Sequence, residues 1–179
     1  MTPSRAELSS LPSDIRDLLV RRSERIGKSA ATADGEDDTL WVAAFSLGDR
    51  EYALSLPMLR AAMPLRSVTR VPRSSRVVLG VLQFQGQVIA ALSTATLLGS
   101  RWHATPTVLL VVDLGATRTV ALDCVQVPVA KTLPLSAFRE ACIASDGPIV
   151  RVGVPGRAAV HVVDLAQLLD DQDWGTADE

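Results

Sequence analysis

The side chains in this sequence that most often carry chemistry are two histidines and two cysteines, and their spacing assembles no catalytic or metal site. Cys124 and Cys142 form neither a CxxC nor a CxxxxC pattern, so we expect neither a zinc centre nor a disulfide framework. His161 lies in the apolar run 159–163, where a satisfied strand histidine is expected. His103 lies in the stretch 100–104 and is interpreted as an exposed linker residue, with a contact or switch role as the alternative.

The carboxylates do not indicate catalysis either. Asp113, Asp123 and Asp164 fall at predicted strand ends or helix caps, and paired-carboxylate chemistry would require two of them to converge. Cys124 follows Asp123 in a predicted strand, where we expect a buried, inert thiol. The motifs of phosphate-binding loops, zinc proteases and serine hydrolases do not occur. The sequence predicts that the protein is not an enzyme; the competing enzyme hypothesis needs Cys124 or His161 in a pocket with a perturbed pKa.

Composition narrows the class of protein further. The 179 residues are 47% hydrophobic, which is enough for one large domain or two small ones without disulfides. Net charge is only −2 and aromatic residues make up 4%, so nucleic acid is not an expected partner. We find no signal-peptide pattern at the start and no apolar run near the roughly 18 residues of a membrane span. The expected location is cytoplasmic, without membrane insertion.

The chain is predicted to divide into three parts. Residues 1–39 hold an amphipathic helix over 13–26, with Ser13 as its N-cap and Gly27 as its stop, and then a small, acidic linker. Residues 40–170 form the folded domain, and 171–179 form a tail.

Inside the domain the hydrophobic period changes from helical to two, which is typical of strands. The pattern predicts hairpins over 41–56, 77–92 and 108–122 and a further turn at 153–157. An internal repeat relates 88–98 to 159–169: each copy is a β-branched strand, a capping residue (Ser93 or Asp164) and a short helix ending in Leu-Leu. We therefore predict two small β-barrels, about 40–100 and 106–170, each followed by a short helix.

These elements carry a series of motifs in a fixed order. Residues 45–54 fit F-x-L-G-x-x-x-Y-x-L, residues 68–72 fit V-T-R-V-P, residues 79–81 are Leu-Gly-Val, residues 120–123 end in Leu-Asp, and residues 162–169 read V-V-D-L-A-Q-L-L. In order and spacing they resemble the CheW family, the coupling scaffolds of bacterial chemotaxis. The resemblance implies a mainly β fold of two five-stranded SH3-like barrels packed on a shared core. It also implies no cofactor, and an adaptor that bridges a methyl-accepting chemotaxis receptor and a CheA-type histidine kinase.

Two charges of the family pattern are missing. Gln85 stands where the family carries arginine in Asn-Leu-Arg-Gly, and Ala61 stands where it commonly carries an acid. Because a charge at an interface centre can contribute about 2 kcal/mol or more, we predict a divergent member that binds one of the two partners and not the other. The partner-binding residues that the resemblance implies are six in number: Leu59, Ala61, Met63, Gln85, Val108 and Val125.

An adaptor should recognise its partners through an exposed apolar patch, expected from residues such as Leu59, Met63, Val108 and Val125. Leu59 has two interpretations, an exposed anchor or a plug at the end of the first barrel. The alternative function is a ligand- or nucleic-acid-binding barrel, for which four arginines at spacings of three to four residues offer a basic surface: Arg66, Arg70, Arg73 and Arg76.

Overall fold

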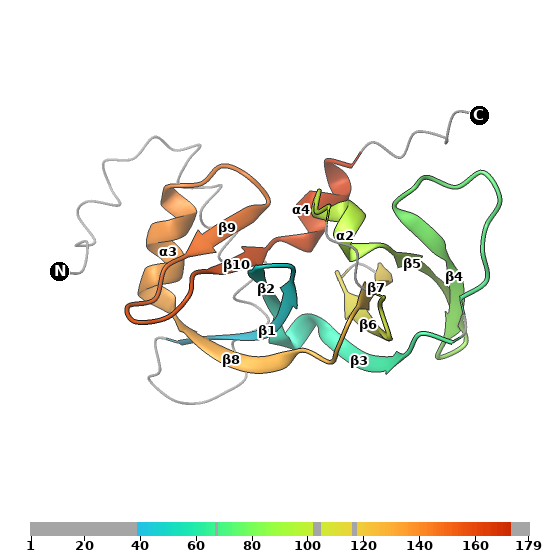
Figure 1. Ribbon diagram of the computed structural model, residues 1–179, viewed down its shortest axis with the longest axis horizontal. Helices are drawn as coiled ribbons and strands as arrows, with labels where there is room; N and C mark the ends of the chain where they lie inside the picture. The colour runs from blue at the N-terminus through green and yellow to red at the C-terminus, as the bar shows by residue number, and fades with distance from the viewer. Residues whose placement is uncertain (1–38, 67, 102–104, 116–117, 173–179) are drawn as a thin grey trace.

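The computed structural model describes residues 39–66, 68–101, 105–115 and 118–172. Ten strands form two antiparallel-rich sheets of five, and short helices lie between and beside them (Figure 1). Sheet A has the strand order β8-β1-β2-β10-β9 and sheet B the order β3-β6-β7-β5-β4. The strands of sheet A are β1 Thr39–Leu47, β2 Arg50–Ser55, β8 Val129–Pro134, β9 Ile149–Val152 and β10 Val160–Val163. Helix α3 Leu135–Ile143 follows β8, and helix α4 Leu165–Asp170 follows β10. The strands of sheet B are β3 Leu59–Pro64, β4 Val78–Phe84, β5 Gln87–Leu92, β6 Val108–Asp113 and β7 Thr119–Cys124. The 3-10 helix η2 Leu56–Met58 precedes β3, and helix α2 Thr94–Leu97 follows β5.

The predicted hairpins are confirmed: β1 pairs with β2, β4 with β5, β6 with β7 and β9 with β10. Local chemistry explains why they form, since alternating apolar residues bury one face and the turns supply left-handed backbone. In the β4–β5 turn both central residues have positive φ, 48° at Gln85 and 82° at Gly86. That is the pattern of a type I′ turn, whose twist matches the flanking strands.

The two sheets are not the two consecutive halves of the domain, 40–100 and 106–170. The chain leaves sheet A after β2 to form β3 at the edge of sheet B, and it leaves sheet B after β7 to form β8 at the edge of sheet A. The reciprocal crossings place β8 and β3 along one side of the molecule (Figure 1). Hairpin patterns are local, whereas the sheet that receives an edge strand depends on burial far along the chain, so the periodicity did not reveal the exchange.

The expectation of closed barrels is wrong, because both sheets are open. No ladder joins β8 to β9 or β3 to β4 among the described residues. In sheet A, α3 packs against β8 and β9 and fills the gap, with Phe138 and Cys142 buried there. In sheet B an isolated bridge joins Thr69, in the described part of the β3–β4 loop, to Val81 of β4. Helix α3 supplies the apolar cover that a closing strand pair would otherwise provide.

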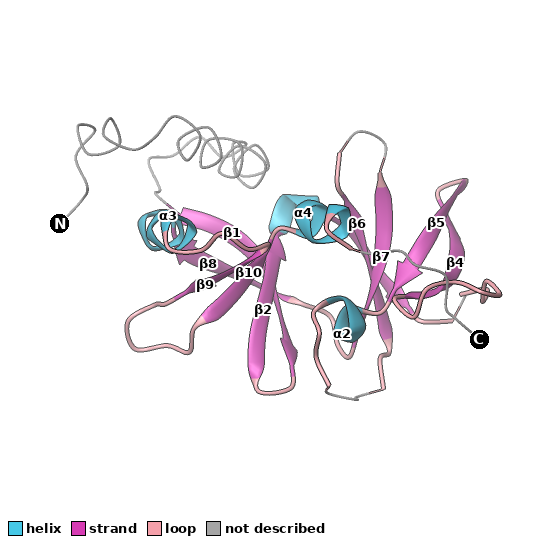
Figure 2. Cartoon of the chain, turned by 90° about the horizontal axis from the view of Figure 1, so that it is seen from above, coloured by secondary structure: helices cyan, strands magenta, loops and turns pink. Residues whose placement is uncertain are grey.

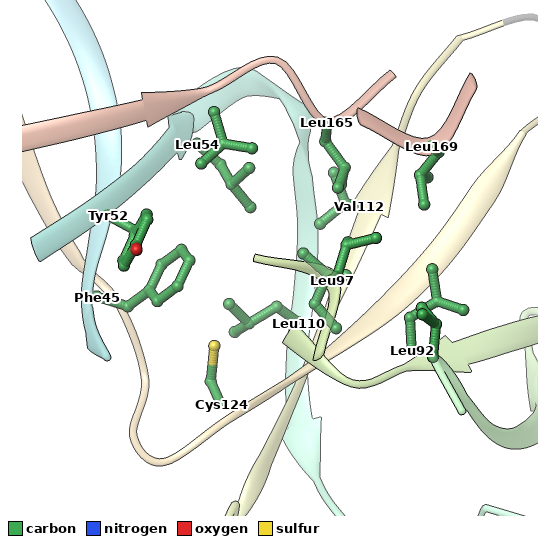
Figure 3. Close-up of a cluster of buried hydrophobic side chains, with 13 residues drawn as sticks. Phe45, Tyr52, Leu54, Leu92, Leu97, Leu110, Val112, Cys124, Leu165 and Leu169 are labelled. Carbon is green, nitrogen blue, oxygen red and sulfur yellow. The ribbon is translucent and has the colours of Figure 1, made fainter. Parts of the chain in front are cut away.

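Three apolar clusters hold the domain together. One lies inside sheet A with α3, and one lies inside sheet B. The third, the central core, joins the two sheets and takes side chains from both of them and from α2 and α4 (Figure 3). Its members include Phe45, Tyr52, Leu54, Leu92, Leu97, Leu110, Val112, Leu122, Cys124, Leu165 and Leu169. The predicted shared core is therefore present, and the sheets form one packed unit.

The two short helices of the internal repeat are confirmed. Ser93 caps α2 by accepting a hydrogen bond from the Thr96 N–H, and Asp164 caps α4 by accepting one from the Gln167 N–H. The helices approach the centre of the molecule from opposite sides in Figure 2. The helix predicted over 13–26 lies outside the described residues. No helix in the described part of the chain has the length and apolar character to cross a membrane.

Candidate partner-binding surface

Strand β3 carries three of the six predicted contact residues and is an edge strand of sheet B. It pairs with β6 on one side only, with a register shift between Leu59 and Ala61. Leu59 is half-buried against the central core, and Ala61 and Met63 are half-buried against the sheet B core. The strand alternates, so its exposed side chains are the intervening Arg60, Ala62 and Pro64. The predicted contact residues thus lie on the inward face of the strand.

Val108 and Val125 lie together near the end of β3. Val108 is opposite Pro64 on β3 and opposite Cys124 on β7, and Val125 follows Cys124 directly. The Thr107 N–H donates to the Cys124 carbonyl at 2.9 Å, and the Thr107 hydroxyl donates to the Val125 carbonyl at 2.6 Å. Val108 packs against the central core and both valines are half-buried. The structure therefore gathers five of the six residues on β3 and the adjoining ends of β6 and β7.

Gln85 is placed apart from these five. It is exposed at the tip of the β4–β5 hairpin, and β4 is the opposite edge of sheet B from β3. Its backbone occupies the left-handed region, and the side chain therefore leaves a rigid turn toward solvent. A charge restored at this position would need no rearrangement of the core.

The expected exposed patch differs from the one observed. Leu59, Met63, Val108 and Val125 are all half-buried. Two exposed large apolar side chains lie where the chain passes from β7 to β8: Val127 in the connecting segment, at 57%, and Val129, the first residue of β8, at 59%. Others in the described residues are Trp41 and Val88 on strands, Val71 in the β3–β4 loop and Ile143 in α3. Exposed apolar surface is therefore present where the chain crosses from sheet B to sheet A, which sequence patterning did not single out.

An ion pair fixes the start of β3 to the end of β6. The Arg60 guanidinium donates to the Asp113 carboxylate through both Nε, at 3.0 Å, and Nη2. Asp113 also accepts a hydrogen bond from the Gly115 N–H at 2.8 Å. The Arg60 hydrogen bond first, and the Gly115 N–H second, hold the pKa of Asp113 below its ordinary value of 3.8. Arg60 is thus occupied at the edge that the adaptor hypothesis assigns to a partner.

The structure gives Cys124 and Asp123 no catalytic geometry. Burial, with a smaller contribution from the charge of Asp123, raises the pKa of the Cys124 thiol to about 12. Asp123 is engaged with α2, because it accepts a hydrogen bond from the Thr94 N–H at 2.6 Å. Cys142 is likewise buried. The predicted inert thiol at Cys124 agrees with this environment.

His161 is a half-buried strand residue. Its Nδ1 lies 3.2 Å from the Glu51 carbonyl oxygen, to which it donates when it carries the proton, and its ring is 5.3 Å from that of Tyr52. It borders an open groove of about 1190 Å³ between the β1–β2 turn, β8 and the β9–β10 loop. The side chain of Glu51, which also lines the groove, forms an ion pair with Lys131 at 2.5 Å. Among the described residues no three histidine, cysteine or carboxylate side chains gather as metal ligands; His103 lies outside the described residues.

The comparisons with known proteins agree with this architecture. The model of the CheW-like domain matches residues 42–173, so the chain belongs to the CheW-like domain family. Among solved structures it is similar to the scaffolding protein TtCheW from Thermoanaerobacter tengcongensis, with a TM-score of 0.54 and 14% sequence identity over 76% of this chain and 96% of that one. At that identity the likeness establishes the fold. No curated protein matches the chain.

Three elements were missed from sequence: β3, which carries part of the candidate surface, and β8 and α3 of the other sheet. Helix α3 has apolar residues at helical spacing, with Leu135, Phe138 and Cys142 on its inward side. Strands β3 and β8 are each six residues long and end in proline, at Pro64 and Pro134. Proline can end an edge strand because no neighbour needs its N–H. The shared pattern of a short apolar run ending in Pro-Leu could have identified both edge strands.

Proposed function

We propose that the protein is a non-catalytic adaptor of bacterial chemosensory signalling, from the class that couples a methyl-accepting chemotaxis receptor to a CheA-type histidine kinase, and that it binds only one of these two partners. The observation that carries the proposal is the match of the CheW-like domain over residues 42–173, on a fold with two sheets joined by one core. A rigid unit of this kind can hold two proteins in a fixed relation, because a contact made on either sheet is coupled to the other sheet through packed side chains.

The proposed contact region is the sheet B edge formed by β3, the start of β6 and the end of β7, together with the β4–β5 turn. Five half-buried residues support this edge through their packing: Leu59, Ala61, Met63, Val108 and Val125. The side chain of Gln85 is exposed at the turn. Edge strands offer unpaired backbone groups as well as side chains to a partner. The exposed Val127 and Val129 add apolar surface where the chain passes from the end of β7 into β8.

The neutral residues at positions 61 and 85 support the second part of the proposal, that one of the two partners is bound and the other is not. An interface centre that has lost a charge leaves the matching charge of the partner unpaired, and that costs affinity. A cytoplasmic location follows from the same proposal, since both partners act there.

The proposal is tested by isothermal titration calorimetry, in which the 179-residue chain is titrated with each of two partner fragments. One is a soluble receptor signalling-tip fragment and the other is the regulatory domain of the kinase. We expect saturable binding to one fragment and at least tenfold weaker binding to the other. Binding to neither fragment contradicts the adaptor role, and equally tight binding to both contradicts the single-partner interpretation.

A further inference from the structure

Charge is distributed very unevenly along this chain. From Tyr52 to Val112 the sequence contains six arginines and not one aspartate or glutamate, although the whole chain has 20 acidic residues. Residues 59–124, which include every strand of sheet B, carry seven arginines against two aspartates, a net charge of +5. Since the chain as a whole carries −2, the remainder carries −7. Sheet B is therefore a basic half on an acidic protein.

Four of these arginines lie within eleven consecutive residues of the segment between β3 and β4, and we call them the arginine patch: Arg66, Arg70, Arg73 and Arg76. All four are exposed. None of them forms an ion pair with a carboxylate in the part of the chain that the structure describes. Arg60, by contrast, is neutralised by Asp113. The patch presents positive charge that the fold itself does not use.

Backbone contacts attach the described residues 68–76, which carry three of the four arginines, to β4. Thr69 and Val81 exchange two backbone hydrogen bonds of 2.8 Å, which attach the loop to β4. A Cβ atom at Gly80 would approach the Thr69 carbonyl oxygen to 2.2 Å, so glycine is required for this close contact. The Ser74 hydroxyl donates to the Val71 carbonyl at 2.9 Å and closes the tip. Because the backbone is already fixed, a partner would spend little free energy in ordering it.

Arg73 has a backbone conformation that does not suit arginine. It follows Pro72 in the tip and has a φ of 59°, a position in which glycine or asparagine is preferred. Strained backbone positions cluster at sites of recognition, and the exposed Arg73 forms no ion pair within the described residues.

We propose that the arginine patch binds a carboxylate-rich segment of a partner protein. All four side chains are arginine, whose planar guanidinium pairs with a carboxylate through two parallel hydrogen bonds. The exposed Val71, at 41%, adds an apolar contact in the middle of the patch. A long nucleic acid fits less well, because the described part of the loop offers no aromatic ring for stacking. This surface lies outside the six proposed contact residues and does not rest on the proposed adaptor function.

The experiment measures binding of a fluorescein-labelled oligoglutamate peptide to the full-length chain by fluorescence anisotropy, at about 50 and 200 mM sodium chloride. The variant Arg70→Gln/Arg76→Gln removes two charges of the patch. The matched control Arg151→Gln/Arg157→Gln removes two other exposed arginines that have no ion pair in the described structure. We expect about a fivefold or greater loss of affinity in the patch variant, less than about a twofold loss in the control, and weaker binding at the higher salt concentration.

Equal losses in the two variants, or no loss in either, would overturn the proposal. Two further probes test the choice of partner: oligothymidylate and vesicles of phosphatidylcholine and phosphatidylserine. Tighter binding of either probe than of the peptide, with loss in the patch variant, would overturn the assignment to a protein segment. If Arg70→Gln/Arg76→Gln does not fold, the variant Arg70→Lys/Arg76→Lys is used, because it keeps the charge and removes the two parallel hydrogen bonds of the guanidinium. We then expect a smaller but measurable loss of peptide affinity.

Discussion

Asp123 on β7 and Thr94 at the start of α2 form a reciprocal pair of hydrogen bonds. The Asp123 carboxylate accepts from the Thr94 N–H at 2.6 Å, and the Thr94 hydroxyl donates to the Asp123 carbonyl at 2.5 Å. The contact places the first turn of α2 on the end of β7, next to the buried Cys124. A helix that follows one strand of sheet B is thereby fixed to another strand of the same sheet.

This pair leads to a prediction about pH. Burial raises the pKa of Asp123 above 3.8, and the Thr94 hydrogen bonds oppose the shift. The folded state therefore holds its proton to a higher pH than the unfolded chain, and the contribution of Asp123 to stability falls as pH rises through the interval between the two pKa values. Asp123→Asn keeps an oxygen for the Thr94 N–H and removes the charge. We expect it to match or exceed the native free energy of unfolding at neutral pH, by up to about 1 kcal/mol, and to lose that advantage in acid.

Urea unfolding of both proteins at neutral and acid pH measures this difference. The control is Asp123→Ala, which leaves the Thr94 N–H without its acceptor and should cost about 1–3 kcal/mol at either pH. A marked loss of stability in Asp123→Asn at neutral pH would show that the charge itself holds α2 in place.

The two cysteines should be unreactive in the folded protein. With a pKa of about 12, Cys124 contains almost no thiolate at mildly alkaline pH, and Cys142 is buried. We expect an aromatic disulfide reagent to modify neither thiol until denaturant is added. The exposed position 105 provides the control, because Thr105→Cys should react within minutes under the same conditions. Rapid modification of the native chain would contradict the burial of both thiols.

Alternate residues of β3 should separate folding from binding. Leu59 packs against the central core, so Leu59→Asp should destabilise the fold by about 2–4 kcal/mol. Ala62 is exposed on the same strand, and Ala62→Asp should change stability by less than about 1 kcal/mol while weakening partner binding. Thermal melting and the receptor and kinase titrations measure the two effects. If Leu59→Asp melts like the native protein, Leu59 is the exposed anchor that the sequence resemblance suggested.

Restoring the two missing charges of the family pattern tests the single-partner proposal. Gln85→Arg changes an exposed turn residue and should raise affinity for the weakly bound partner by about tenfold without a change in melting temperature. Ala61→Glu introduces a carboxylate beside the sheet B core, so it should also lower stability by about 1–2 kcal/mol. Measuring the variants singly and together distinguishes an affinity gain from a folding defect. Unchanged affinity for both partners in all three would place the altered specificity elsewhere.

Removal of residues 1–38 should leave the β domain folded. Strand β1 begins at Thr39, and within the described residues the members of the three apolar clusters pack against one another from Leu40 to Leu169. We expect cooperative thermal unfolding and the circular dichroism of a β-rich protein in the truncated chain. A broad, non-cooperative transition would mean that the N-terminal segment contributes to the core.

The family resemblance implied the shared apolar core, and the residue pattern by itself determined the hairpins and the two capped helices. These features depend on neighbouring residues: alternation buries one face of a strand, left-handed turns reverse the chain, and Ser93 and Asp164 satisfy the N–H groups of the next helical turn. The inert character of Cys124 could also be predicted, because an apolar β-branched strand leaves a thiol without a base.

Only the tertiary structure decided which sheet receives β3 and β8, and with that which side chains face a partner. Leu59, Ala61 and Met63 alternate with Arg60, Ala62 and Pro64, so the pattern shows that one set is buried without saying which surface the other set joins. That choice depends on pairing with β6, whose residues lie about 50 positions later in the chain. The packing of α3 into the opening of sheet A is another such contact, because its apolar side chains are buried only when β8 and β9 stand apart. The physical reason is the same in both cases. The local sequence pattern determines which side of an element is apolar, and burial against residues distant in the chain determines which other element covers that side.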